Sequence, residues 1–171
     1  MTKIFIDGSA GTTGLRIFDR LKDRKDITLV TLSDELRKDI EARRDALNNC
    51  DVAFLCLPDK AAIEAVSLIE NKNVAVIDTS TAHRVNDNWT YGFPELLESY
   101  DVIRNSKRIA NPGCHASGFN ALVAPLTKAG LLKIDANLSC FSLTGYSGGG
   151  KQMIAEYESD SRDVLLDAPR M

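Results

Sequence analysis

The feature that most constrains the fold is a regular switch of hydrophobic period between residues 3 and 80. Short apolar runs with strand character alternate with segments whose apolar positions repeat at helical spacing. The expected strands cover residues 3–8, 27–33, 51–58 and 73–80, and the expected helices cover residues 14–23, 34–49 and 59–72. Helices between strands act as right-handed crossovers, which make the strands parallel. The pattern predicts an α/β fold with a doubly wound, Rossmann-type parallel sheet.

A different pattern begins near residue 110, where the run "RIANPG" closes the alternation. We expect a helix over residues 114–130, then a strand in "NLSCFSL" that runs into a glycine-rich loop, and a last helix over residues 152–168. We therefore predict a dinucleotide-binding domain over residues 1–112. We expect residues 113–171 to be the start of an α+β catalytic or substrate domain, because they are too few to complete one.

The composition fits a globular protein that acts on a small molecule. Of the 171 residues, 44% are hydrophobic and 26% are charged. The 21 basic and 24 acidic residues are spread along the chain and give a net charge of -3, so no basic patch predicts nucleic-acid binding. The apolar runs are too short to cross a membrane, and the N-terminus lacks a signal-peptide layout. We expect a cytoplasmic protein whose partner is a small molecule or another copy of the chain.

The segment "GSAGTTG" lies between the first expected strand and the first expected helix. A dinucleotide fold needs glycines there for a tight turn, for close approach to a pyrophosphate and for packing of helix on strand, and the helix N-terminus binds the anion. The candidate cofactor-binding residues of this segment are Gly8, Ser9, Gly11, Thr12, Thr13 and Gly14. A glycine-rich turn without a ligand is the alternative interpretation.

The segment "LSDELRK" follows the second expected strand, where dinucleotide folds bind the adenosine ribose. An NAD-specific site carries a carboxylate at the strand tip, but Ser33 holds that position here and Asp34 and Glu35 follow it. Ser33 and Arg37 are candidates for binding a 2′-phosphate, which predicts NADP as the cofactor. The alternative is that these are solvated residues of an ordinary charged helix.

The segment "NPGC" places Cys114 directly after a turn and at the start of an expected helix. Pro112 restricts the backbone, and Gly113 permits a sharp turn and close approach of a substrate. The amide groups of a helix N-terminus stabilise a thiolate, which is the nucleophilic form of cysteine. These features predict that Cys114 is a catalytic nucleophile.

The other cysteines, Cys50, Cys56 and Cys140, lie in or beside apolar strand patterns. In such a pattern we expect cysteine to behave as a small buried hydrophobic residue. The four cysteines show no paired spacing and no metal-ligand spacing, so we expect lone thiols, no disulfide and no metal site.

Three motifs in this order, "GSAGTTG", "NPGC" and "GYSGGGK", resemble those of N-acetyl-γ-glutamyl-phosphate reductase of arginine biosynthesis, and "NPGCHASGF" resembles the shorter, second type of that family. The resemblance extends over essentially the whole chain. It implies NADPH-dependent reduction of N-acetyl-glutamyl 5-phosphate to N-acetyl-glutamate 5-semialdehyde and phosphate, through a cysteine thioester. It also implies a homo-oligomer for the full-length form.

The resemblance also assigns roles to residues. Cys114 matches the nucleophilic cysteine of the family, and the glycines of "GSAGTTG" match its NADP pyrophosphate loop. Residues 145–151 match a segment near the nicotinamide and the substrate, which adds Ser147 and Gly148 to the candidate cofactor-binding residues. The glycines of this segment also fit an anion site at the start of a helix.

One departure from the family concerns its catalytic histidine, which lies in a later part of the substrate domain, whereas this chain has only His83 and His115. Consecutive residues of a helix point about 100° apart, so His115 is a poor base for Cys114, and we expect it to be structural or to line the substrate. We expect His83 to be a loop or cofactor-side residue. Because family members are substantially longer, the chain is interpreted as an N-terminal fragment or truncated product that is poorly active alone.

Two other functions stay open. A related acyl-phosphate reductase, such as aspartate-semialdehyde dehydrogenase, acts on a substrate with an ammonium group and predicts a pocket carboxylate that pairs with it. A nucleotide-binding module without catalysis predicts cofactor binding without turnover.

Overall fold

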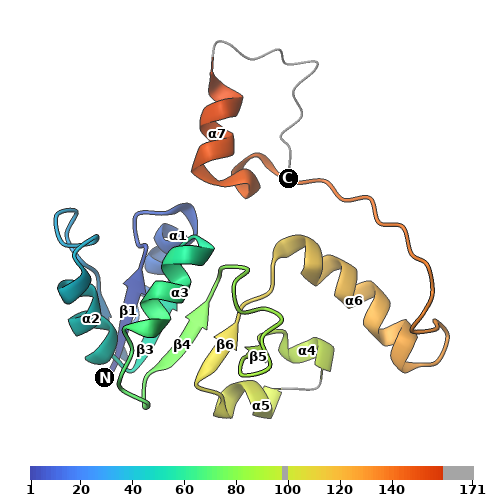
Figure 1. The fold of residues 1–171 in the computed structure, drawn as a ribbon, viewed down its shortest axis with the longest axis horizontal. Coiled ribbons are helices and arrows are strands. Elements are labelled where there is room, and N and C mark those ends of the chain that lie inside the picture. Colours follow the sequence, from blue (N-terminus) through green and yellow to red (C-terminus); the bar gives the residue numbers. More distant parts are fainter. Residues whose placement is uncertain (98–99, 160–171) are drawn as a thin grey trace. The chain divides into compact units, whose positions relative to one another are not determined.

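The computed structural model describes residues 1–97 and 100–159 (Figure 1). Within these residues six strands form one parallel sheet in the order β2-β1-β3-β4-β6-β5. The strands are β1 (Thr2–Asp7), β2 (Ile27–Val30), β3 (Val52–Leu55), β4 (Ala75–Asp78), β5 (Thr90–Tyr91) and β6 (Arg108–Ala110). Because they are parallel, all of them end at the same edge of the sheet, where a doubly wound fold binds its ligands.

Helices cover both faces of the first half of the sheet. On one face, α1 (Thr12–Leu21) packs over Ile4 of β1. On the other face, α2 (Ile40–Asn48) and α3 (Asp59–Ser67) pack over Phe5, the next residue of the same strand. Successive side chains of a strand point to opposite faces, so apolar runs are buried on both. The predicted doubly wound α/β fold is confirmed.

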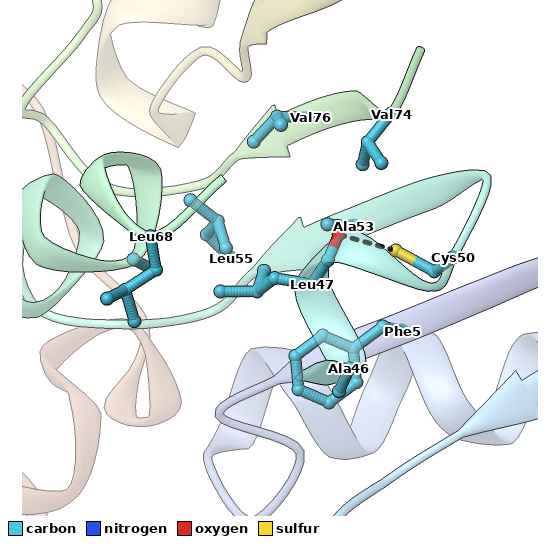
Figure 2. Close-up of a cluster of buried hydrophobic side chains, with 10 residues drawn as sticks. Phe5, Ala46, Leu47, Cys50, Ala53, Leu55, Leu68, Val74 and Val76 are labelled. Carbon is cyan, nitrogen blue, oxygen red and sulfur yellow. Dashed lines mark hydrogen bonds between the residues drawn. The ribbon is translucent and has the colours of Figure 1, made fainter. Parts of the chain in front are cut away.

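Figure 2 shows the buried cluster between the sheet and the helices α2 and α3. Its members are Phe5, Ala46, Leu47, Cys50, Ala53, Leu55, Ala65, Leu68, Val74 and Val76. The dashed line joins Cys50 Sγ to the carbonyl oxygen of Leu47 at 3.5 Å. Burying each large aliphatic side chain contributes about 1.5–3 kcal/mol, so this cluster is a main source of the sheet's stability.

The start of α2 differs from the prediction. The charged pattern predicts a helix from residue 34, but residues 34–38 form turns and α2 begins at Ile40. The carboxylate of Asp39 accepts a hydrogen bond from the backbone amide of Ala42 at 2.7 Å and caps the helix. Aspartate favours such caps over helix interiors, so the predicted helix is wrong for residues 34–39.

The second half of the sheet is built from shorter elements. β6 lies between β4 and β5, and β5 has only two residues. The helices α4 (Pro94–Leu97) and α5 (Tyr100–Asn105) lie between β5 and β6 along the chain. The predicted helix after "NPG" is confirmed as α6 (Cys114–Lys128).

The contacts of the chain divide it into two compact units, residues 1–137 and residues 138–171. This division groups α6 with the sheet, whereas the sequence places a functional boundary between residues 112 and 113. That boundary stays a prediction about the role of each part.

The expected strand in "NLSCFSL" is wrong, because residues 138–145 form no strand. The described elements of the second unit are η1 (Tyr146–Gly149), a 3₁₀ helix, and α7 (Gly150–Glu158). A strand needs a neighbour that pairs its amides and carbonyls, and residues 138–159 contain none. Phe141 is accordingly 88% exposed. Residues 160–168 of the expected last helix lie outside the described residues.

Across the part of the chain that the structure describes, no helix combines the length and apolar character needed to cross a membrane. In that same part, no group of three or more His, Cys, Asp or Glu side chains is placed to hold a metal ion.

Candidate cofactor and thiol site

The turn after β1 requires glycine at its first position. Gly8 has a φ of +84°, a left-handed conformation that other residues rarely adopt. A Cβ atom on Gly8 would lie 2.3 Å from the carbonyl oxygen of Cys56, which follows β3. The turn therefore lies where β2 and β3 flank β1 on opposite sides. This is the switch point at which doubly wound folds bind nucleotides.

The other glycines of the turn let α1 approach it closely. A Cβ on Gly14 would lie 2.4 Å from the carbonyl oxygen of Gly8, and a Cβ on Gly11 would lie 3.3 Å from it. Gly11 begins α1 without a side-chain cap, and the first turn of the helix has no acidic residue. Such an N-terminus favours an anion, so these residues fit a dinucleotide pyrophosphate. The candidate cofactor-binding residues Gly8, Ser9, Gly11, Thr12, Thr13 and Gly14 lie in this turn and at the start of α1, and their role at a cofactor stays a prediction.

A buried ion cluster, which the sequence analysis misses, adjoins this turn. Asp7 ends β1, and its carboxylate accepts hydrogen bonds from Arg43 Nε at 3.1 Å and Nη2 at 3.0 Å. Arg43 Nη1 donates to Glu64 of α3 at 2.9 Å. The pKa of the Asp7 carboxyl is raised overall, because the effect of burial is larger than the opposing effect of Arg43. Arg43 is 5% exposed as a residue, and its hydrogen bonds join β1, α2 and α3 inside the fold.

The strand β2 ends at Val30, so Ser33 lies three residues beyond the strand tip at which the sequence places it. Ser33 and Arg37 share the following turn, where the carbonyl oxygen of Ser33 accepts the amide of Arg37, and each side chain already has an acidic partner. Ser33 Oγ donates to Glu35 Oε2 at 3.2 Å, and Arg37 Nε lies 3.2 Å from Asp34 Oδ1. The turn therefore offers carboxylates of the kind that bind a ribose 2′-hydroxyl and a guanidinium of the kind that binds a 2′-phosphate. This geometry fits a nicotinamide dinucleotide without selecting between NAD and NADP.

Cys114 is the first residue of α6 and is exposed. No side chain caps the helix, and its first turn has no acidic residue. Three steps separate β1 from β6 in the sheet, so their ends lie about 14 Å apart at the usual strand spacing. The predicted nucleophile and the predicted cofactor loop therefore follow strands that end at the same edge.

The reason for glycine at position 113 differs from the prediction. Gly113 has φ -78° and ψ 156°, an extended conformation open to any residue, so the turn does not demand glycine. A Cβ on Gly113 would lie 2.6 Å from Arg84 Nη1. A larger residue at position 113 would therefore make the guanidinium of Arg84 shift.

The four thiols differ in exposure. Cys50 is buried, which raises the pKa of its thiol, and burial raises the pKa of Cys56 to about 11. Cys50 fits the prediction of a small buried hydrophobic residue, whereas Cys56 is only partly buried. The prediction is wrong for Cys140, which is exposed because its segment forms no strand.

The two histidines lie in different settings. His83 lies in the loop after β4, as predicted, and its Nδ1 is 2.6 Å from the buried carboxylate of Asp78. Its ring stacks on Trp89 with centroids 4.1 Å apart. His115 is partly buried beside Cys114 on α6. Asp78 lies five positions before His83 and Trp89 lies six positions after it, but the sequence alone does not indicate that either side chain contacts the imidazole.

Residues 145–151 belong to the second unit and span η1 and the start of α7. The backbone amide of Gly148 donates to the carbonyl oxygen of Gly145 at 2.8 Å, and Gly150 has a φ of +70°. Ser147 lies in η1. The role of Ser147 and Gly148 at a cofactor stays a prediction.

The fold also resembles solved structures. Aspartate semialdehyde dehydrogenase II from Vibrio cholerae, complexed with ASA, superposes with a TM-score of 0.60 at 19% identity, over 91% of this chain and 50% of that one. Aspartate semialdehyde dehydrogenase from Francisella tularensis gives a TM-score of 0.61 at 16% identity, over 96% of this chain and 53% of that one. At these identities the likeness concerns the fold.

Sequence comparison finds much closer relatives. N-acetyl-gamma-glutamyl-phosphate reductase of Chelativorans sp. (strain BNC1) is 53% identical over 95% of this chain and 53% of the relative. The protein of the same name from Burkholderia orbicola (strain MC0-3) is 51% identical over 91% of this chain and 50% of the relative. The chain thus spans about half the length of the curated relatives it matches. The resemblance to that reductase, drawn from three motifs, is confirmed.

A family profile described as "Semialdehyde dehydrogenase, NAD binding domain" matches residues 3–103. This range contains the cofactor loop, the strands β2 to β5, and β1 from its second residue on, and it ends before β6. The match covers more than half of the chain and coincides with the doubly wound sheet. The chain therefore belongs to the semialdehyde dehydrogenase family, of which it contains the NAD-binding domain.

Proposed function

We propose that this chain is the cofactor-binding and thiol-bearing part of an NADPH-dependent N-acetyl-γ-glutamyl-phosphate reductase. The observation that carries the proposal is the arrangement of the sheet edge: the glycine turn follows β1, and Cys114 begins α6 just after β6. Relatives about half identical over nearly the whole chain bear the name of that reductase and support the choice of substrate.

Cys114 acts as the nucleophile in this proposal. Its thiolate attacks the acyl carbon of N-acetyl-glutamyl 5-phosphate, amide donors stabilise the oxyanion, and the C–O bond to phosphate breaks to leave a thioester. NADPH, when bound, supplies the hydride that reduces this thioester. Hydride addition leaves a thiohemiacetal alkoxide on Cys114, whose oxygen forms the aldehyde C=O bond as the C–S bond breaks, which releases N-acetyl-glutamate 5-semialdehyde and returns the thiolate. The α6 N-terminus favours the thiolate at both ends of this cycle.

The cofactor is held by the turn after β1. Gly8 and Gly14 leave the space that a Cβ would fill, and the uncapped start of α1 faces the anion of the pyrophosphate. Arg37 and Ser33 support NADP rather than NAD, because a guanidinium and a hydroxyl suit a 2′-phosphate. The cytoplasm, a homo-oligomeric full-length form and a small acyl-phosphate substrate belong to the same proposal.

The test is phosphate-dependent reduction of NADP by N-acetyl-glutamate 5-semialdehyde, the reverse reaction, followed by appearance of NADPH. Cys114→Ser should abolish it, while Cys140→Ser should leave it unchanged. Faster reaction with aspartate 4-semialdehyde would instead assign the chain to the sister reductase. Tight NADPH binding without detectable acylation of Cys114 would assign it to a nucleotide-binding module.

A further inference from the structure

The loop between β4 and β5 is fixed by a buried carboxylate. Asp78, the last residue of β4, is 0% exposed. Its Oδ1 accepts the backbone amide of Ser80 at 3.0 Å, and its Oδ2 accepts the Ser80 hydroxyl at 2.7 Å. The same Oδ2 lies 2.6 Å from His83 Nδ1. With Nδ1 as the donor, this carboxylate oxygen accepts from both the imidazole and the Ser80 hydroxyl.

His83 is held from a second side by an aromatic ring. The imidazole of His83, 7% exposed, stacks on Trp89 at an interplanar angle of 16°, and Trp89 packs against the core of Figure 2. The backbone carbonyl of His83 also accepts the amide of Asn86 at 3.2 Å. The indole of Trp89, the carboxylate of Asp78 and the backbone bond to Asn86 together fix the orientation of His83. The backbone of the next residue, Arg84, is therefore held in place as well.

That next residue, Arg84, bridges the ends of two strands. Its Nε donates to the carbonyl oxygen of Asn111 at 3.1 Å, and its Nη2 donates to the carbonyl oxygen of Thr79 at 3.0 Å. Thr79 follows β4, and Asn111 follows β6. A planar guanidinium with fixed donor directions suits two acceptors at once, which a lysine ammonium does not reproduce.

The third nitrogen of Arg84 lies against the turn that begins α6. A Cβ on Gly113 would meet Nη1 at 2.6 Å, and Gly113 is the N-cap of the helix that starts with Cys114. The backbone carbonyl of Gly113 accepts both the amide and the hydroxyl of Ser117 at 2.8 Å, so the cap is tied to the first turn of the helix. The position of the guanidinium therefore bears on the backbone around Cys114.

We propose that Arg84 is a positioning residue for Cys114. Asp78, His83 and Trp89 fix the loop, Arg84 joins the carbonyls beyond β4 and β6, and the uncapped start of α6 is held where it stabilises the Cys114 thiolate. The proposal deepens the proposed function, since it rests on Cys114 being the nucleophile. Loosening this clamp frays the first turn of α6, and because Cys114 is already exposed, lost thiolate stabilisation outweighs any gain in access.

The experiment measures the rate of iodoacetamide labelling at neutral pH, by peptide mapping, for Cys114 relative to Cys140 in the same chain. Arg84→Met and His83→Phe should each slow Cys114 about twofold to fivefold, the range expected for a helix-terminus interaction, and leave Cys140 unchanged. Arg84→Lys should recover part of the loss. Arg24→Met removes an arginine from an exposed ion pair with Asp26 and is the matched control, which should change neither rate.

An unchanged ratio for Arg84→Met, with circular dichroism like that of the parent chain, would overturn the proposal. If Arg84→Met does not fold, the variants Arg84→Lys and Gly113→Ala decide instead, because the added Cβ of Gly113→Ala displaces the guanidinium. Slower labelling of Cys114 in both variants supports the proposal, and unchanged labelling in both refutes it. Failure of the proposed function looks different. In that case Cys114 of the parent chain shows no reactivity above that of Cys140, whatever the variants do.

Discussion

The turn after β1 and the turn after β6 lie at the same edge of one sheet but are held by different kinds of contact. Around the first turn, backbone atoms set the geometry. The carbonyl oxygen of Cys56 occupies the space that a Cβ on Gly8 would need, and the carbonyl oxygen of Gly8 occupies the space that a Cβ on Gly14 would need. Around the second turn, a side chain sets the geometry, because Arg84 reaches across 27 positions to Asn111. The first turn therefore tolerates no added Cβ, whereas the second depends on a separate loop being in place.

The largest effect is expected for the buried ion pair between Arg43 and Asp7, the side-chain contact that adjoins the first turn. Arg43→Met leaves the buried carboxylate of Asp7 without its partner, so the free energy of unfolding should fall by about 3–5 kcal/mol. Urea denaturation measures it. Arg24→Met is the control on an exposed pair and should leave the midpoint unchanged. A small effect from Arg43→Met would mean that backbone contacts alone hold this end of β1.

The cysteine beside each turn offers a second test. Cys56 follows β3 next to Gly8 and has a pKa of about 11 against an ordinary 9.0, which lowers its thiolate fraction about 100-fold. Cys114 begins α6 and is exposed. Limited alkylation at neutral pH should therefore label Cys114 well before Cys56 and Cys50. Labelling of Cys50 or Cys56 before Cys114 would remove the basis for an activated thiol at the second turn.

A glycine-to-alanine substitution tests the close packing around the first turn by its effect on NADPH affinity. Gly14→Ala places a Cβ 2.4 Å from the Gly8 carbonyl oxygen, so the start of α1 must shift and the Kd for NADPH should rise about tenfold or more. Gly118→Ala in α6 is the matched control, because a Cβ there meets nothing within 4 Å. Fluorescence titration of NADPH gives both values, and equal affinities would contradict the assignment of the first turn to the pyrophosphate.

The smallest effect concerns the exposed turn after β2. Arg37→Glu reverses a charge beside the expected 2′-phosphate and should weaken NADPH binding about twofold to tenfold, more at low salt, while NADH binding stays constant. If the parent chain binds NADH as tightly as NADPH, the carboxylates of Asp34 and Glu35 decide specificity and the NADP assignment is wrong.

Features that depend on residues close together in the sequence could be predicted. The sheet, the first helices and the glycine turn follow from hydrophobic period and from residues at most a few positions apart, such as Gly8 and Gly14. The same local reasoning places Cys114 at a helix start. It fails at Asp39, where a capping side chain overrides a charged helical pattern, and at Cys140, where an apolar run forms no strand and residues 138–159 offer none to pair with.

Features made by distant side chains could not be predicted. Asp7 and Arg43 are 36 positions apart, and Arg84 and Asn111 are 27 apart. Nothing in a charged residue's neighbours along the chain indicates a buried partner on another element. The neighbour of Gly113 could not be predicted for the same reason, since the space beside it is filled by Arg84, 29 positions earlier in the chain.

The most direct test asks whether the two turns serve one site. Saturating NADP should slow the alkylation of Cys114 several-fold in the parent chain, because a dinucleotide bound at the glycine turn lies across the strand ends toward β6. The protection should be lost in Gly14→Ala at the same NADP concentration and kept in Gly118→Ala. Alkylation of Cys114 at the same rate with and without saturating NADP would contradict the account.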